Sequence, residues 1–204
     1  MKLFKAGLLI LVCLCVTQIM SFGEGKVLLI LRETSMDMSY MISHEVGPIL
    51  KMLRDAGYEA DIATETGTIL GSGTSILLPN IRLSEVDVNK YIGLIIPCMG
   101  NPADAVPKFS AEITKNMYGK GLPIAAQQSG VGILKRASLL DGKKYASAEV
   151  YEPKGTNVGT GVVRDGLIIT SAFCPLYAIA GQKDGTEELM TGFIEMLKNL
   201  NSKE

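Results

Sequence analysis

The chain alternates between short continuous hydrophobic runs and segments in which hydrophobic residues recur every three or four positions. Continuous aliphatic runs are typical of strands buried on both faces, and the second spacing is typical of amphipathic helices. The predicted strands are 26–32, 58–63, 91–97, 122–126, 145–150 and a hairpin at 162–170. The predicted helices are 45–56, 109–118, 130–140 and 186–200.

This order of elements predicts the fold class. The chain opens strand–helix–strand, which implies parallel pairing and a right-handed crossover. Asp165 and Gly166 form a two-residue turn signal for an antiparallel hairpin. Glycines and a proline interrupt 64–89, which we interpret as a hairpin or small excursion at the sheet edge, and the Met-bearing segment 33–43 as a loop. The pattern predicts a three-layer α/β/α sandwich with a mostly parallel sheet, flavodoxin-like in type.

The first 23 residues form a unit of their own. Lys2 and Lys5 precede an apolar run from Ala6 to Met20, and the small residues Ser21 and Gly23 suit a cleavage site. This pattern indicates a secretory signal peptide, because the apolar run is shorter than the roughly 20 residues of a membrane span. We therefore expect two parts, a signal peptide at 1–23 and one domain at 24–204. The mature domain is expected to be periplasmic or extracellular, with no stable membrane anchor.

Composition narrows the class of partner. Removal of residues 1–23 removes two lysines and no acid, so the formal net charge changes from −1 to −3. A mildly acidic domain without basic runs argues against nucleic acid as a partner. Of the four cysteines only Cys98 and Cys174 remain, and spacing alone does not show whether they meet in a disulfide. No Cys/His cluster has the spacing of a zinc site, so neither a metal nor a cofactor is predicted.

The stretch around which the chain is organised runs Leu122-Pro-Ile-Ala-Ala-Gln-Gln-Ser-Gly130. A strand that turns sharply into a helix presents one side chain above the carboxyl edge of a parallel sheet. The residue at that turn is predicted to be Gln128. Glutamine is neither a nucleophile nor a base, so this position carries no covalent chemistry.

Several pieces of the chain, taken in order, resemble the ThiJ/PfpI family, a branch of the class I glutamine amidotransferase-like fold. The resemblance covers nearly all of 26–200, and as a set the pieces are specific. They are Lys26–Arg32, Glu45–Pro48, Leu53–Gly57, Gly71–Gly73, Leu78–Pro79, Ser84–Val86, Tyr91–Pro97, Gly121–Ala126 with Gly130, Leu139–Lys143 and Val163–Ser171.

The resemblance implies a pocket at the carboxyl edge of the sheet. Family members carry a nucleophilic cysteine at the strand–helix turn, often a histidine after it, a glutamate from the first helix, and glycines after the third strand. By this correspondence Gln128 replaces the cysteine and Ser129 the histidine, Cys98 and Met99 replace the glycines, and Glu45 keeps the carboxylate. We expect these five residues to line a ligand pocket that Cys98 and Met99 narrow, with the Gln128 amide within reach of Glu45.

Other candidates for chemistry carry alternative explanations. Cys98 and His44, the only histidine, have the residue types for a relocated thiol dyad beside Glu45, whereas the simpler interpretation is a buried free cysteine and a surface histidine. Ser129 is more readily a helix cap than a nucleophile. Three thioethers in one segment suggest a soft-metal site, or more simply a mobile lid or a packed loop; they belong to Met36, Met38 and Met41.

Two hypotheses follow. The first is an exported ThiJ/PfpI-like domain that has lost the family's cysteine chemistry and binds a small molecule or plays a structural role. The second is a cysteine-dependent hydrolase or glyoxalase-like enzyme that uses a relocated thiol, Cys98, with Glu45 and His44 as further catalytic candidates. The resemblance also implies a homodimer.

Overall fold

The computed structural model describes residues 25–102, 104–149 and 155–201, and their main feature is a seven-stranded sheet. Neighbouring strands pair in parallel except for the β10–β11 hairpin, which is antiparallel as its Asp-Gly turn predicts. Across the sheet the strands are β10 (Val162–Asp165), β11 (Ile168–Ser171), β7 (Ile124–Gln127), β6 (Gly93–Ile96), β1 (Lys26–Ile30), β2 (Glu59–Thr64) and β5 (Ile81–Arg82).

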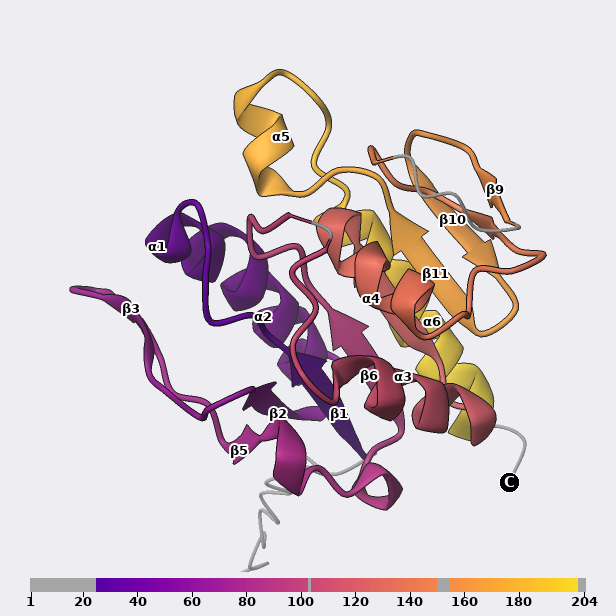
Figure 1. Cartoon of the computed structure of the whole chain (residues 1–204), viewed down its shortest axis with the longest axis horizontal. Helices are drawn as coiled ribbons and strands as arrows, with labels where there is room; N and C mark the ends of the chain where they lie inside the picture. The colour runs from indigo at the N-terminus through magenta and orange to yellow at the C-terminus, as the bar shows by residue number, and fades with distance from the viewer. Residues whose placement is uncertain (1–24, 103, 150–154, 202–204) are drawn as a thin grey trace, which may run out of the picture.

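Helices cover both faces of this sheet (Figure 1). One face of β1, with Val27 and Leu29, packs in a hydrophobic cluster with α1 (Met38–Met41), α2 (Gly47–Asp55) and α6 (Thr186–Asn201). The other face, with Leu28 and Ile30, packs with α3 (Ser110–Gly119) and α4 (Val131–Arg136). Alternate residues of β1 are therefore buried in two separate hydrophobic clusters, one on each face of the sheet, which explains why β1 is continuously hydrophobic. The predicted three-layer α/β/α sandwich is confirmed.

Smaller elements lie outside the main sheet. β3 (Leu70–Ser72) and β4 (Ser75–Leu77) form a hairpin next to α1, which confirms the hairpin interpretation of 64–89. β8 (Lys144–Tyr145) pairs in parallel with β9 (Thr156–Asn157). The predicted strand 145–150 is therefore wrong beyond Tyr145, because only two residues find a partner; Val150 lies outside the described residues. A short helix that the pattern did not indicate, α5 (Pro175–Ile179), follows β11 and projects from the sandwich (Figure 1).

The first helix begins earlier than its hydrophobic spacing indicates. Helical structure starts at Met38, within the segment that we predicted to be a loop, and continues through a π-helical turn at Ile42–Val46 into α2. Pro48 has no N–H for the usual bond, and its ring would crowd the carbonyl of His44 in a regular α-helix. The wider π turn removes that conflict, so the helix passes the proline and does not start at it.

The predicted signal peptide lies outside the described residues. Within the described part of the chain, no helix combines the length and apolarity that a membrane crossing requires.

Candidate functional site

The strand–helix turn after β7 forms as the sequence predicts. Gln128 has a backbone φ of +43°, in the left-handed region that residues other than glycine seldom adopt. It begins a tight helical turn (Gln128–Gly130) that leads into α4. Gly130 lets this turn pack directly against β6, because a Cβ there would lie 2.3 Å from the carbonyl oxygen of Ile96. The turn, which we call the elbow, is thus held against the end of the neighbouring strand.

The Gln128 side chain is buried and bonded at both ends. Its Oε1 accepts a hydrogen bond from the Cys98 thiol at 3.0 Å, and its Nε2 donates to Glu149 Oε1 at 3.0 Å and to Tyr177 Oη at 3.2 Å. The expected contact of this amide with Glu45 is not formed, because the amide is directed to Cys98, Glu149 and Tyr177 and Glu45 accepts two backbone N–H groups. The Gln128 amide therefore links Cys98, which follows β6, to Glu149 and to Tyr177 in α5.

Glu45 lies in the π turn and is completely buried. Its two oxygens accept the backbone N–H groups of Cys98 at 2.7 Å and Met99 at 2.8 Å. Burial raises the pKa of Glu45 well above its ordinary value, the charge of Cys98 adds to this effect, and the two N–H donors oppose it. The carboxyl group therefore holds the turn after β6, where Met99 has a φ of +53°.

The Cys98 thiol is almost completely buried, at 1% exposure, and is surrounded by polar groups. A hydrogen bond with the Cys174 thiol is the largest of the effects that lower the pKa of Cys98 from 9.0 to about 6; the Ser129 hydroxyl and the positive charge of Arg32 act in the same direction. The same thiol contact, together with burial, raises the pKa of Cys174. Of the two thiols, Cys98 is therefore the one that loses its proton more readily.

Arg32 follows β1 and directs its guanidinium at the backbone of two neighbouring segments. It is 3% exposed and donates to the carbonyl oxygens of Pro97 at 3.0 Å and Ser129 at 3.3 Å, to the Ser129 hydroxyl at 3.0 Å, and to the carbonyl oxygen of Cys98. The fixed fork of an arginine suits several acceptors at once. Arg32 therefore fastens the loop after β6 to the elbow.

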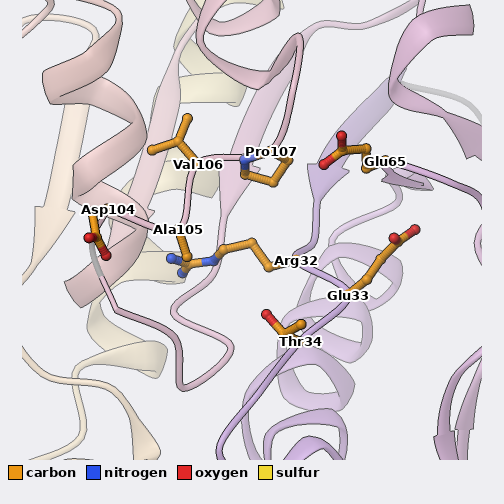
Figure 2. A pocket seen from close by; sticks show the side chains of 8 residues that line it. All are labelled: Arg32, Glu33, Thr34, Glu65, Asp104, Ala105, Val106 and Pro107. Carbon is orange, nitrogen blue, oxygen red and sulfur yellow. The ribbon is translucent and has the colours of Figure 1, made fainter.

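A cleft of about 350 Å³ is lined by Arg32 together with residues of the neighbouring loops. Figure 2 shows the Arg32 side chain reaching toward Asp104 and Ala105, while Glu33 and Glu65 stand on the opposite side of the cleft. Among the described residues, no three Asp, Glu, His or Cys side chains lie close enough to hold a metal ion.

Comparison with known proteins places this site in a family. Residues 25–178 match the DJ-1/PfpI family. The chain belongs to the DJ-1/PfpI family. A deglycase of Thermococcus kodakarensis is 27% identical over 114 residues, which cover 54% of this chain and 68% of that protein.

Solved structures of DJ-1/PfpI proteins share the fold. A ThiJ/PfpI domain protein of Brachyspira murdochii has a TM-score of 0.70 at 16% identity, over 85% of this chain and 96% of that one. DJ-1beta of Drosophila melanogaster has a TM-score of 0.58 at 21% identity, over 88% and 96% of the two chains. Both likenesses support the class I glutamine amidotransferase-like fold that the resemblance implies.

The structure brings the five expected residues together through direct hydrogen bonds. Cys98 contacts Glu45, Gln128 and Ser129, and Met99 follows Cys98 in the turn that Glu45 holds. The Met99 side chain is fully buried in a hydrophobic cluster, so it fills space next to the elbow as expected. The Ser129 hydroxyl donates to the carbonyl oxygen of Cys98 at 3.0 Å and does not cap the helix.

His44 lies apart from the thiol. It is exposed, its ring stacks on Tyr40 at 4.0 Å between centroids, and its Nδ1 contacts the carbonyl oxygen of Tyr40 at 3.0 Å. In the described part of the chain, Cys98 and His44 share no hydrogen bond, which matches the simpler interpretation of both residues. His44 precedes Glu45 directly, and consecutive helical residues point in different directions.

The three methionines considered for a soft metal lie in different environments. Met36 is 85% exposed, Met38 is partly buried, and Met41 belongs to the core. The structure therefore favours packing for Met41 and surface exposure for Met36.

Sequence reasoning missed three polar residues of the site, Arg32, Glu149 and Tyr177, and left Cys174 without a role. A charged residue directly after a buried strand was a usable signal for Arg32, since a buried cation needs acceptors. Glu149 lies in the predicted strand 145–150 and Tyr177 in a helix that the pattern did not indicate, and only the tertiary fold brings both to the elbow.

Proposed function

We propose that this DJ-1/PfpI protein has no thiol chemistry at its elbow and acts as a ligand-binding or structural module. The observation that carries the proposal is Gln128 at the strained turn where, by the resemblance, other members keep a nucleophile. An amide can donate and accept hydrogen bonds but cannot attack a carbonyl group. Its donors and acceptor are already engaged by Glu149, Tyr177 and Cys98.

The chemistry of a ligand follows from the groups around the amide. Glu149 offers a carboxylate, Tyr177 a hydroxyl, and Gln128 an amide, and the first two are only partly buried. A small polar molecule with hydrogen-bond donors would compete with the Gln128 amide for the Glu149 carboxylate. We infer that such a ligand enters between Glu149 and Tyr177.

The test is turnover on substrates of the family's reaction types. Purified protein is incubated with methylglyoxal, a simple amide and a peptide, alongside the variants Gln128→Ala and Cys98→Ser. We expect wild type, both variants and protein-free buffer to consume each compound at the same rate. Turnover by wild type that disappears in either variant would overturn the proposal.

A second candidate function is a thiol enzyme that uses Cys98, and the observation in its favour is the lowered pKa of that thiol, about 6. Against it stand the 1% exposure of Cys98 and the orientation of His44 toward Tyr40. After reduction, iodoacetamide labelling of native protein near neutral pH separates the two functions. Rapid labelling at Cys98 favours the enzyme, and labelling as slow as that of an ordinary buried thiol favours the binding module.

Export and assembly complete the proposal. We propose that residues 1–23 direct the domain to the periplasm or the extracellular space, on the basis of their charge and hydrophobic pattern. We further propose a homodimer, by analogy with the family. Sedimentation equilibrium of the mature domain tests the dimer, and a monomeric mass at all concentrations would contradict it.

A further inference from the structure

Two cysteines that are far apart in the sequence meet beneath the elbow. Cys98 follows β6, and Cys174 is the residue that precedes α5. Both are free thiols buried in the same hydrophobic cluster, and each shifts the pKa of the other, so the two side chains lie close together. Two thiols that share one buried space are candidates for a disulfide.

The surroundings give the two sulfurs different roles. The Ser129 hydroxyl lies 3.4 Å from the sulfur of Cys98, and Arg32 is bonded to the carbonyl oxygen of the same residue. These donors favour the thiolate at Cys98, whereas Cys174 keeps its proton. Cys98 is therefore the sulfur that reacts first with an oxidant, and Cys174 is placed to resolve the product.

We propose that Cys98 and Cys174 are a redox couple that closes to a disulfide with hydrogen peroxide as the oxidant. The Cys98 thiolate attacks one peroxide oxygen, the O–O bond breaks, and the departing hydroxide takes up a proton to form water, which leaves a sulfenic acid on Cys98. The sulfur of Cys174 then attacks the sulfenic sulfur, loses its proton and releases a second water. In total two thiols are oxidised to one disulfide while one peroxide is reduced to two waters.

Closing the disulfide changes the elbow. When Cys98 is protonated, Gln128 Oε1 accepts a hydrogen bond from its thiol, whereas a disulfide can never donate that bond. The bond also ties the start of α5, which carries Tyr177, to the end of β6, whereas α5 otherwise projects from the sandwich (Figure 1). The groups that meet Gln128 would thus differ between the two redox states, in whichever function the site serves.

The experiment uses the full chain without any variant first. Reduced protein is treated with peroxide, its remaining thiols are blocked with maleimide under denaturing conditions, and its peptides are mapped by mass spectrometry. We expect a peptide containing Cys98 joined to one containing Cys174, lighter by two hydrogen atoms than the separate peptides. Dithiothreitol should restore maleimide uptake at both positions. Cross-links to Cys13, Cys15 or a second chain instead of this pair would overturn the proposal.

Variants separate the attacking sulfur from the resolving one. In Cys174→Ser the oxidation of Cys98 should stop at the sulfenic acid, which dimedone then traps. Cys174→Ala takes its place if Cys174→Ser does not fold. Glu195→Gln on the exposed face of α6 keeps both sulfurs and serves as the matched control, which should still form the disulfide. If wild type gives a dimedone adduct on Cys98, or maleimide on both cysteines after peroxide, the couple does not exist.

Discussion

Glu45 and Cys98 show, at the scale of single residues, how one buried polar contact shapes a site. The carboxyl group accepts two backbone N–H bonds from the turn after β6, so it fixes the position of the Cys98 sulfur. The turn includes Met99 in a left-handed conformation, which is unfavourable unless neighbouring groups hold it. Glu45 is thus a positioning residue for the thiol in this structure.

Replacing Glu45 tests that role. In Glu45→Gln the amide oxygen accepts one of the two N–H groups, and the amide nitrogen faces the other. One buried donor then lacks an acceptor, so we expect a loss of about 1–3 kcal/mol in the free energy of unfolding. Denaturant unfolding measures it, with Glu195→Gln on the exposed face of α6 as the matched control. Equal stability of the two variants would refute the role of the carboxyl group.

The lowered pKa of Cys98 predicts a pH dependence of stability. The thiol titrates near 6 in the folded protein, and near its ordinary value of 9.0 when unfolded. A group whose pKa falls on folding stabilises the protein fully above the unfolded pKa, and this contribution disappears as pH falls through the folded pKa. We therefore expect the contribution of Cys98 to the free energy of unfolding to rise between pH 6 and 9, by about 1.4 kcal/mol for each unit of pKa difference.

The variant Cys98→Ser removes the titration of this thiol together with the effect of its charge on the pKa values of Glu45 and Cys174. The difference in unfolding free energy between wild type and variant should grow as pH rises from 6 to 9, under reducing conditions. A difference that stays constant over this range would show that the thiol is not ionised in the folded state.

At the scale of elements, the site depends on how closely the elbow approaches β6. Gly130 allows this approach, because its Cα faces the carbonyl oxygens of Ile96 and Pro97. Arg32 then bonds to both segments. The approach and the bonds together bring the Cys98 and Gln128 side chains within hydrogen-bond distance.

A methyl group at Gly130 should push the elbow away from β6. In Gly130→Ala the new Cβ would lie 2.3 Å from a backbone oxygen that cannot rotate away. We expect a loss of about 1–3 kcal/mol in unfolding free energy from this overpacking. The control is Gly119→Ala in α3, where nothing lies within 4 Å of the added Cβ and we expect no loss. Similar melting temperatures for both variants would contradict the tight contact.

At the scale of the whole molecule, the strand order decides which residues meet. β1, β6 and β7 are neighbours in the middle of a parallel sheet, so their carboxyl ends place Arg32, Cys98 and Gln128 at one edge. Ligand sites in open α/β sheets form at this edge. The segment with Glu149 and the helix α5 then enclose the edge from the side of β11.

The proposed export is tested on the whole chain. If residues 1–23 are removed during secretion, protein recovered from the periplasm or medium should begin at Glu24 and carry the formal charge of −3. Amino-terminal sequencing and intact mass measure this directly. A mature chain that still begins at Met1 would contradict the signal peptide, and Lys2→Glu together with Lys5→Glu should reduce export by removing the positive charges.

The sequence by itself determined the sandwich, the hairpin and the elbow with Gln128 at its turn. Continuous hydrophobic runs, helical spacing and turn residues depend on local chemistry and on burial of the nearest face, and all three can be read without knowing the fold. The resemblance to the family also located Glu45 and Cys98 correctly beside the elbow. The start of the first helix could not be predicted from the sequence. Pro48 suggested that the helix begins close to it, whereas a π turn lets the helix run from Met38 past the proline.

Only the tertiary structure decided which groups Gln128 and Glu45 bind. Hydrogen bonds between distant segments depend on side-chain direction and on which oxygens are already occupied, and neither is encoded in spacing. Glu45 accepts the backbone N–H groups of Cys98 and Met99. The Gln128 amide group donates to Glu149 and Tyr177. The meeting of Cys98 with Cys174 is likewise a result of packing, since two segments without a common local pattern converge on one buried space.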